Sequence, residues 1–100
     1  MDKLTEARTI INEADRAMAA LFVRRMEAAR MAAEYKQAHG LPILDADRER
    51  EVLERNAALV ADETLRPYYR AFLQHLMDLS KDYQRQLCAE DAPAAGREDR

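Results

Sequence analysis

The sequence is poor in the residues that interrupt helices and in those that build disulfide or metal frameworks. Its 100 residues include two glycines, three prolines, one cysteine and no tryptophan. Glycine and proline disfavour a helix interior more than any other residue, so their scarcity leaves room for long helices. The single cysteine, Cys88, excludes an intrachain disulfide and a zinc site built from several cysteines.

An excess of positive charge and long apolar runs are also missing. The chain has 16 basic and 19 acidic residues and a net charge of −3, which lacks the basic surplus of a nucleic-acid-binding protein. No apolar stretch approaches membrane-spanning length. Asp2, Lys3, Glu6 and Arg8 interrupt the place where a signal peptide needs its apolar segment. We therefore expect a cytoplasmic protein that binds neither nucleic acid nor a membrane.

The residues that are present favour one small all-α domain, and its first helix is unusually long. Apolar residues recur in steps of three and four from Leu4 to Tyr35, with Arg25 at one of these positions. Gly40 and Pro42 then provide a helix stop. The pattern predicts a helix over residues 4–38. A helix of this length is about 50 Å long, whereas a compact domain of this size has a radius of gyration near 13 Å. One chain cannot cover such a stripe, so we expect a homodimer in which two long helices pack together.

Two further helices follow from caps and apolar spacing. Asp45 or Asp47 can cap a helix over residues 48–62, whose inner face holds Val52, Leu53, Ala57 and Val60. Thr64 and Pro67 mark the start of a third helix that reaches about Cys88. Its apolar side contains Tyr69, Phe72, Leu73, Leu76, Tyr83 and Leu87, with Ser80 in the same stripe. Residues 89–100 contain no aliphatic side chain larger than alanine, and we expect a disordered tail beside a domain of residues 1–88.

Several polar residues interrupt the apolar faces. Arg25 and Lys36 are eleven residues apart, which places them within about 20° of each other around the first helix. Two cations would then share a half-buried face, although each alone could extend along the helix to solvent. Arg8 precedes Arg25 by seventeen residues, about 25 Å along the axis. If both arginines serve one small ligand, Arg8 must come from a second copy of the chain.

Further polar residues lie on the expected second and third helices. Ser80 and Gln84 lie four residues apart on the inner side of the third helix, and the run from Asp45 to Glu51 combines capping carboxylates with alternating charge. Each feature alone has an ordinary structural explanation. His39 and His75 have no partners at metal-ligand spacing, so we expect no metal site. Together, several cations with one carboxylate, one hydroxyl and one amide favour a small polar dianion as the ligand.

These residues, in this order and spacing, resemble the all-helical AroQ-type chorismate mutases. The resemblance covers residues 4–87. Its pattern is Arg8, Asp15, Arg25 within Val23-Arg24-Arg25-Met26, Lys36, Pro42, the run Asp45-Ala46-Asp47-Arg48-Glu49-Arg50, and Ser80 with Gln84. The resemblance implies an intertwined homodimer of the chorismate mutase II-like fold. It also implies rearrangement of chorismate to prephenate in phenylalanine and tyrosine biosynthesis, without a cofactor.

The resemblance further implies a role for each matching residue. Arg25, and Arg8 of the second chain, would bind the two substrate carboxylates, with Ser80 assisting and Arg48 adding positive potential. Lys36 and Gln84 would contact the ether oxygen. Glu49 and the backbone at Asp45 would bind the ring hydroxyl. The expected site therefore comprises Lys36, Gln84 and Glu49 as catalytic residues, and Arg8, Arg25, Asp45, Arg48 and Ser80 as substrate-binding residues.

Two alternatives remain open at this point. An isochorismate-pyruvate lyase of the same fold uses a similar cationic pocket to eliminate pyruvate from an isomer of chorismate, and Glu49 favours the mutase as a partner for the ring hydroxyl. A non-catalytic helical dimer, which binds a chorismate-like acid or regulates another enzyme, would need neither Lys36 nor Gln84. Assays with both substrates distinguish the three functions.

Overall fold

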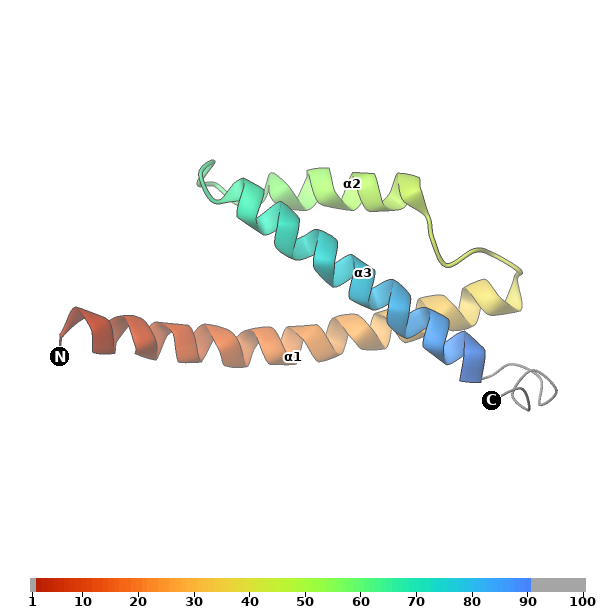
Figure 1. The fold of residues 1–100 in the computed structure, drawn as a ribbon, viewed down its shortest axis with the longest axis horizontal. Helices are drawn as coiled ribbons and strands as arrows, with labels where there is room; N and C mark the ends of the chain where they lie inside the picture. The colour runs from red at the N-terminus through yellow and green to blue at the C-terminus, as the bar shows by residue number, and fades with distance from the viewer. Residues whose placement is uncertain (1, 91–100) are drawn as a thin grey trace.

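The computed structural model describes residues 2–90, and within this range every regular element is a helix. Helix α1 spans Lys3–Ala38, α2 spans Ala46–Ala57 and α3 spans Arg66–Glu90. Figure 1 shows α3 running diagonally between α2 and the C-terminal half of α1. The all-α, three-helix architecture predicted from the sequence is confirmed. Over these residues no helix combines the length and the apolar character that crossing a membrane requires.

Helix α1 begins and ends close to the predicted residues. Asp2 caps its start, because the carboxylate accepts a hydrogen bond from the Thr5 amide at 2.8 Å. At the other end Gly40 adopts a positive φ of 65°, a conformation that is unfavourable for residues with a Cβ. The amide of Leu41 then donates to the Lys36 carbonyl at 2.8 Å. The helix is therefore closed at both ends by local hydrogen bonds.

Helix α2 is shorter than predicted, ending at Ala57 instead of near Asp62. The amides of Leu59 and Val60 donate to the carbonyls three residues before them, at 3.0 and 3.1 Å, so the α-helical spacing of four residues ends here. The Val60 carbonyl accepts from Arg66 Nε at 2.6 Å. The carboxylate of Asp62 accepts from both the amide and the hydroxyl of Thr64, at 2.9 and 2.7 Å. This Asx turn competes with helical hydrogen bonds. The helix therefore ends earlier than the apolar spacing alone predicts.

Helix α3 starts two residues after Thr64, with Pro67 in its first turn. Its backbone continues to Glu90, two residues beyond the expected end at Cys88. The expectation of a disordered tail otherwise concerns residues 91–100, which lie outside the described residues. Phe72 was expected on the inner face but is 50% exposed.

The core is small, and it forms where α3 packs against α2 and against α1. Leu73 and Met77 of α3 are buried against Val52 of α2, with Leu53, Tyr69 and Leu76 packed around them. On the other side, the buried residues of α1 are Ala29 and Ala33. Because α3 packs against both α1 and α2, it sets how these two helices lie relative to each other.

The apolar face of α1 is covered along one half only. Positions 4, 11, 18, 25, 29, 33 and 36 fall within a narrow sector of the helix circumference. The part from residue 25 onward meets α3, whereas Leu4, Ile11 and Met18 remain 58, 54 and 48% exposed. The radius of gyration is 17.9 Å, well above the roughly 13 Å of a compact chain of this size. The N-terminal half of α1 extends alone in Figure 1.

Candidate functional site

A pocket of about 130 Å³ opens where the three helices meet the α1–α2 connection. Seven of the eight residues expected in the site line it, and Arg8 is the exception. The lining residues are Arg25 and Lys36 of α1, Ile43 and Asp45 of the connection, Arg48 and Glu49 of α2, and Met77, Ser80, Lys81 and Gln84 of α3. The fold thus brings together residues that are up to about 60 positions apart in the sequence.

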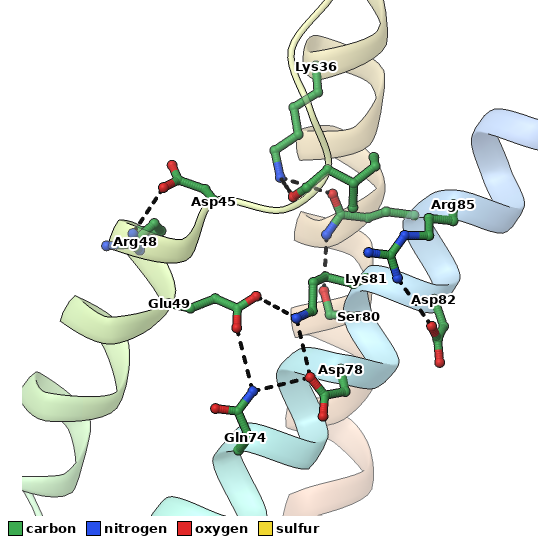
Figure 2. Close-up of polar contacts among 12 residues, drawn as sticks. Lys36, Asp45, Arg48, Glu49, Gln74, Asp78, Ser80, Lys81, Asp82 and Arg85 are labelled. Carbon is green, nitrogen blue, oxygen red and sulfur yellow. Dashed lines mark hydrogen bonds and ion pairs between the residues drawn. The ribbon is translucent and has the colours of Figure 1, made fainter.

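A chain of hydrogen bonds joins α1 to α3 at one wall of the pocket (Figure 2). The Lys36 ammonium donates to the Ile43 carbonyl at 2.9 Å and to Gln84 Oε1 at 3.3 Å. Gln84 Nε2 in turn donates to Ser80 Oγ at 3.2 Å. Ser80 and Gln84 are only 7 and 6% exposed, so these partners satisfy polar groups that would otherwise be costly to bury.

Among the pocket cations, Arg25 is the one for which residues 2–90 provide no hydrogen bond or ion pair. The residue is half-buried. A guanidinium presents several donors in a planar fork that matches a carboxylate. Arg25 and Lys36 both line the pocket, as their predicted common face requires.

The N-terminus of α2 forms the second wall. Asp45 caps this helix, since its carboxylate accepts from the Arg48 amide at 3.0 Å. The exposed Arg48 guanidinium pairs with Glu51 at 3.2 Å. Glu49 is half-buried and faces α3 across the pocket, where its Oε1 accepts from Gln74 Nε2 at 3.5 Å.

Lys81 is a pocket residue that the sequence analysis missed. Its ammonium lies 2.7 Å from Glu49 Oε2 and 3.3 Å from Asp78 Oδ1. The hydrogen bond to Glu49 raises the pKa of Lys81; burial opposes this, and Asp78 adds to it. The signal was present in the sequence, because Met77, Ser80, Lys81 and Gln84 follow the steps of three and four that define one helix face.

The charge of the pocket is opposite to that of the chain. Four cations, Arg25, Lys36, Arg48 and Lys81, and two carboxylates, Asp45 and Glu49, line it, which gives a formal charge of 4 − 2 = +2. The whole chain carries −3. Such a pocket attracts a small anion and can bind it through directed donors. Within residues 2–90 no three His, Cys, Asp or Glu side chains are arranged to hold a metal ion.

Arg8 lies on the exposed N-terminal half of α1, seventeen residues before Arg25. A continuous helix separates these two positions by about 25 Å, so Arg8 cannot enter the pocket of its own chain. The sequence argument for its distance from Arg25 therefore agrees with the observed unbroken helix.

No curated protein and no solved structure matches the chain. A family model described as chorismate mutase type II matches residues 7–85, a segment that includes all eight expected site residues. The chain therefore belongs to the chorismate mutase type II family.

Proposed function

We propose that this protein is a chorismate mutase that rearranges chorismate to prephenate, supplying phenylalanine and tyrosine biosynthesis. The observation that carries the proposal is the contact between Lys36 and Gln84, which places two side chains with remaining N–H donors side by side on the wall of a net cationic pocket. The rearrangement is unimolecular: a carbon–oxygen bond breaks while a carbon–carbon bond forms. It needs no nucleophile, only a folded substrate and donors for the ether oxygen as that atom gains negative charge.

Lys36 and Gln84 have donor capacity left for that oxygen. An ammonium has three N–H bonds, of which the Ile43 carbonyl and Gln84 Oε1 accept two. The Gln84 amide has two, of which Ser80 Oγ accepts one. Donation from Lys36 to Gln84 Oε1 also polarises the amide, which strengthens its remaining N–H as a donor.

Arg25 suits one substrate carboxylate, because the residue is half-buried and its guanidinium has no partner along residues 2–90. Arg8 of a second chain is proposed for the other carboxylate. Holding both carboxylates selects the compact conformer in which the reacting carbons meet, and orientation of this kind can supply several kcal/mol. Arg48 adds positive potential, and Ser80 donates beside Gln84.

Glu49 is proposed to accept the ring hydroxyl, with the backbone at Asp45. Each oxygen of the Glu49 carboxylate accepts one hydrogen bond in the structure, from Lys81 and from Gln74. A carboxylate has about four acceptor positions, so capacity remains for a hydroxyl donor.

A second copy of this chain is proposed to cover the exposed face of α1. Leu4, Ile11, Met18 and Leu21 are about half exposed on that helix. An apolar surface of this extent is typical of an interface rather than of a monomer. The same pairing would carry Arg8 toward the pocket of the partner.

The test is the conversion of chorismate by purified protein, with prephenate identified by its acid conversion to phenylpyruvate. We expect turnover by the wild type and a loss of about a hundred- to a thousandfold in Lys36→Ala, the range for one donor at a developing oxyanion. Lys3→Ala removes an exposed lysine outside the pocket and should retain activity. Circular dichroism verifies that both variants are folded.

Two results would reject the mutase. Turnover of isochorismate to pyruvate and salicylate, without turnover of chorismate, would identify the lyase. Stabilisation against heat by chorismate without any product would identify a binding protein.

A further inference from the structure

The pocket contains an ion pair in which one residue, Lys81, has no role in the proposed reaction described above. Lys81 and Glu49 approach to 2.7 Å, and their side chains are only 17 and 19% exposed. Six other ion pairs within residues 2–90 join residues only three or four apart in the sequence. The Lys81–Glu49 pair instead connects α3 to α2 across the pocket.

Glu49 has few other groups to orient it. Its second oxygen accepts from Gln74 at 3.5 Å, the limit of a hydrogen bond, and the same Gln74 amide also donates to Asp78 at 3.2 Å. Figure 2 shows Lys81 between the two carboxylates of Glu49 and Asp78. The 2.7 Å contact with Lys81 is therefore the principal constraint on the Glu49 rotamer.

The pair also reduces the repulsion between the Glu49 carboxylate and a negatively charged substrate. The proposed substrate is a dianion, and a bare carboxylate in the pocket would repel it. A cation within contact distance compensates that charge while the carboxylate keeps lone pairs for a hydroxyl donor. Lys81 achieves this without using Arg25 or Lys36, both of which remain available for the substrate.

We propose that Lys81 is a positioning residue that holds the Glu49 carboxylate toward the ring hydroxyl of the substrate and compensates its charge. The proposal rests on the proposed function. Lys81 acts through Glu49 and does not bind the substrate itself. The pKa of Lys81, raised mainly by Glu49, agrees with an ammonium that stays charged under all working conditions.

This role makes a quantitative prediction that differs from the one made by direct binding of the substrate to Lys81. If Lys81 acts through Glu49, its effect on turnover disappears once Glu49 has been removed. If Lys81 binds the substrate directly, the two losses add. Lys81→Met keeps the aliphatic stem and removes the ammonium, and Glu49→Ala removes the acceptor.

The experiment measures kcat and KM for chorismate with the wild type, Lys81→Met, Glu49→Ala and the double variant. We expect Lys81→Met to lose about tenfold in kcat/KM, as for one charged hydrogen bond. In the Glu49→Ala background the same substitution should change kcat/KM by less than about twofold. Lys81→Arg, which can still pair with Glu49, should recover most of the activity.

Arg85→Met is the matched control, because it removes a cation four residues further along α3, outside the pocket lining. It should leave kcat/KM unchanged. Unfolding curves compare all variants at one concentration, and a lower melting temperature in Lys81→Met with unchanged kcat/KM would overturn the proposal in favour of a purely structural pair.

Failure of this proposal and failure of the mutase function are distinct results. Equal losses from Lys81→Met with and without Glu49, in an active wild type, would reject the role of Lys81 alone. A folded wild type without chorismate turnover would reject the function, and the role of Lys81 with it.

Discussion

Lys36 Nζ lies 3.3 Å from Gln84 Oε1, although 48 residues separate the two in the chain. The contact joins the C-terminal part of α1 to that of α3, and it brings two donors to the same wall of the pocket. Because the Gln84 oxygen accepts from Lys36, the amide nitrogen is the donating end of that side chain, and Ser80 Oγ accepts one of its two N–H groups. The pair therefore reaches its donating arrangement before any substrate binds.

Replacing the amide by a carboxyl group should make activity depend on acid. In Gln84→Glu the side chain can donate only while protonated. Burial at this 6% exposed position raises the pKa of the new carboxyl, and the adjacent Lys36 ammonium opposes that shift. We expect activity at acidic pH that falls as pH rises through that pKa. The measurement is kcat/KM from about pH 4 to about pH 9. Gln86→Glu, an exposed substitution on α3, should follow the wild-type profile, and alkaline activity in Gln84→Glu would contradict the donor role.

Two inactive variants should restore each other if the site is shared between chains. Arg8→Ala and Arg25→Ala should each lose most activity. In a mixed dimer one of the two sites retains both arginines, so an equimolar mixture in which chains exchange should regain about a quarter of wild-type activity. The mixture is assayed after unfolding and refolding together. Activity no greater than the mean of the separate variants would show that both arginines act within one chain.

A charge on the exposed stripe of α1 should dissociate the proposed dimer. Met18→Glu places a carboxylate where the second copy would pack, and burial of an unpaired charge is costly. We expect a monomer by analytical ultracentrifugation, with loss of activity because Arg8 no longer reaches a second pocket. Met31→Glu is the control: Met31 is 70% exposed and lies about 140° around the same helix. A wild-type monomer with full activity would reject the dimer.

The cap of α2 should affect stability separately from activity. Asp45→Ala removes the acceptor of the Arg48 amide and should lower the free energy of unfolding by about 1 kcal/mol. Asp45→Asn keeps a capping oxygen and should retain both stability and turnover, since only the backbone at this position is proposed to meet the substrate. Urea unfolding at one protein concentration measures the difference. Asp47→Ala, whose side chain is 95% exposed, should change little; equal losses in both alanine variants would argue against the cap.

The Lys81–Glu49 pair should stabilise the fold up to alkaline pH. Because the pKa of Lys81 is raised above 10.5, mainly by Glu49, its contribution is fully present below pH 10.5 and is lost as pH rises through the raised value. The free energy of unfolding of the wild type should therefore exceed that of Lys81→Met at neutral pH and approach it above that range. Unfolding curves for both proteins at several pH values test this, and a difference that persists in strong alkali would contradict the ion pair.

The sequence predicted the start or end of a helix wherever local interactions determine it. Spacing and the Gly40–Pro42 stop predicted α1, and the capping carboxylate at Asp45 predicted the start of α2. The end of α2 was wrong because Arg66 and Asp62 bind backbone and side-chain groups that no apolar pattern reveals. Periodicity also placed Phe72 on the apolar side of α3, but this residue is 50% exposed, because periodicity does not show how far neighbouring helices extend over that side.

The sequence by itself determined the helical class, the long first helix and the residue types of the pocket, because these follow from local propensity and from charges interrupting apolar faces. Tertiary structure decided which of those charges meet. The face of α3 that carries Met77 and Gln84 also turns Lys81 toward Glu49, and only the packing of α2 on α3 makes that ion pair. The packing of α1 on α3 likewise divides one continuous stripe into a covered half and an exposed half, since a straight helix of this length extends past the rest of its own chain.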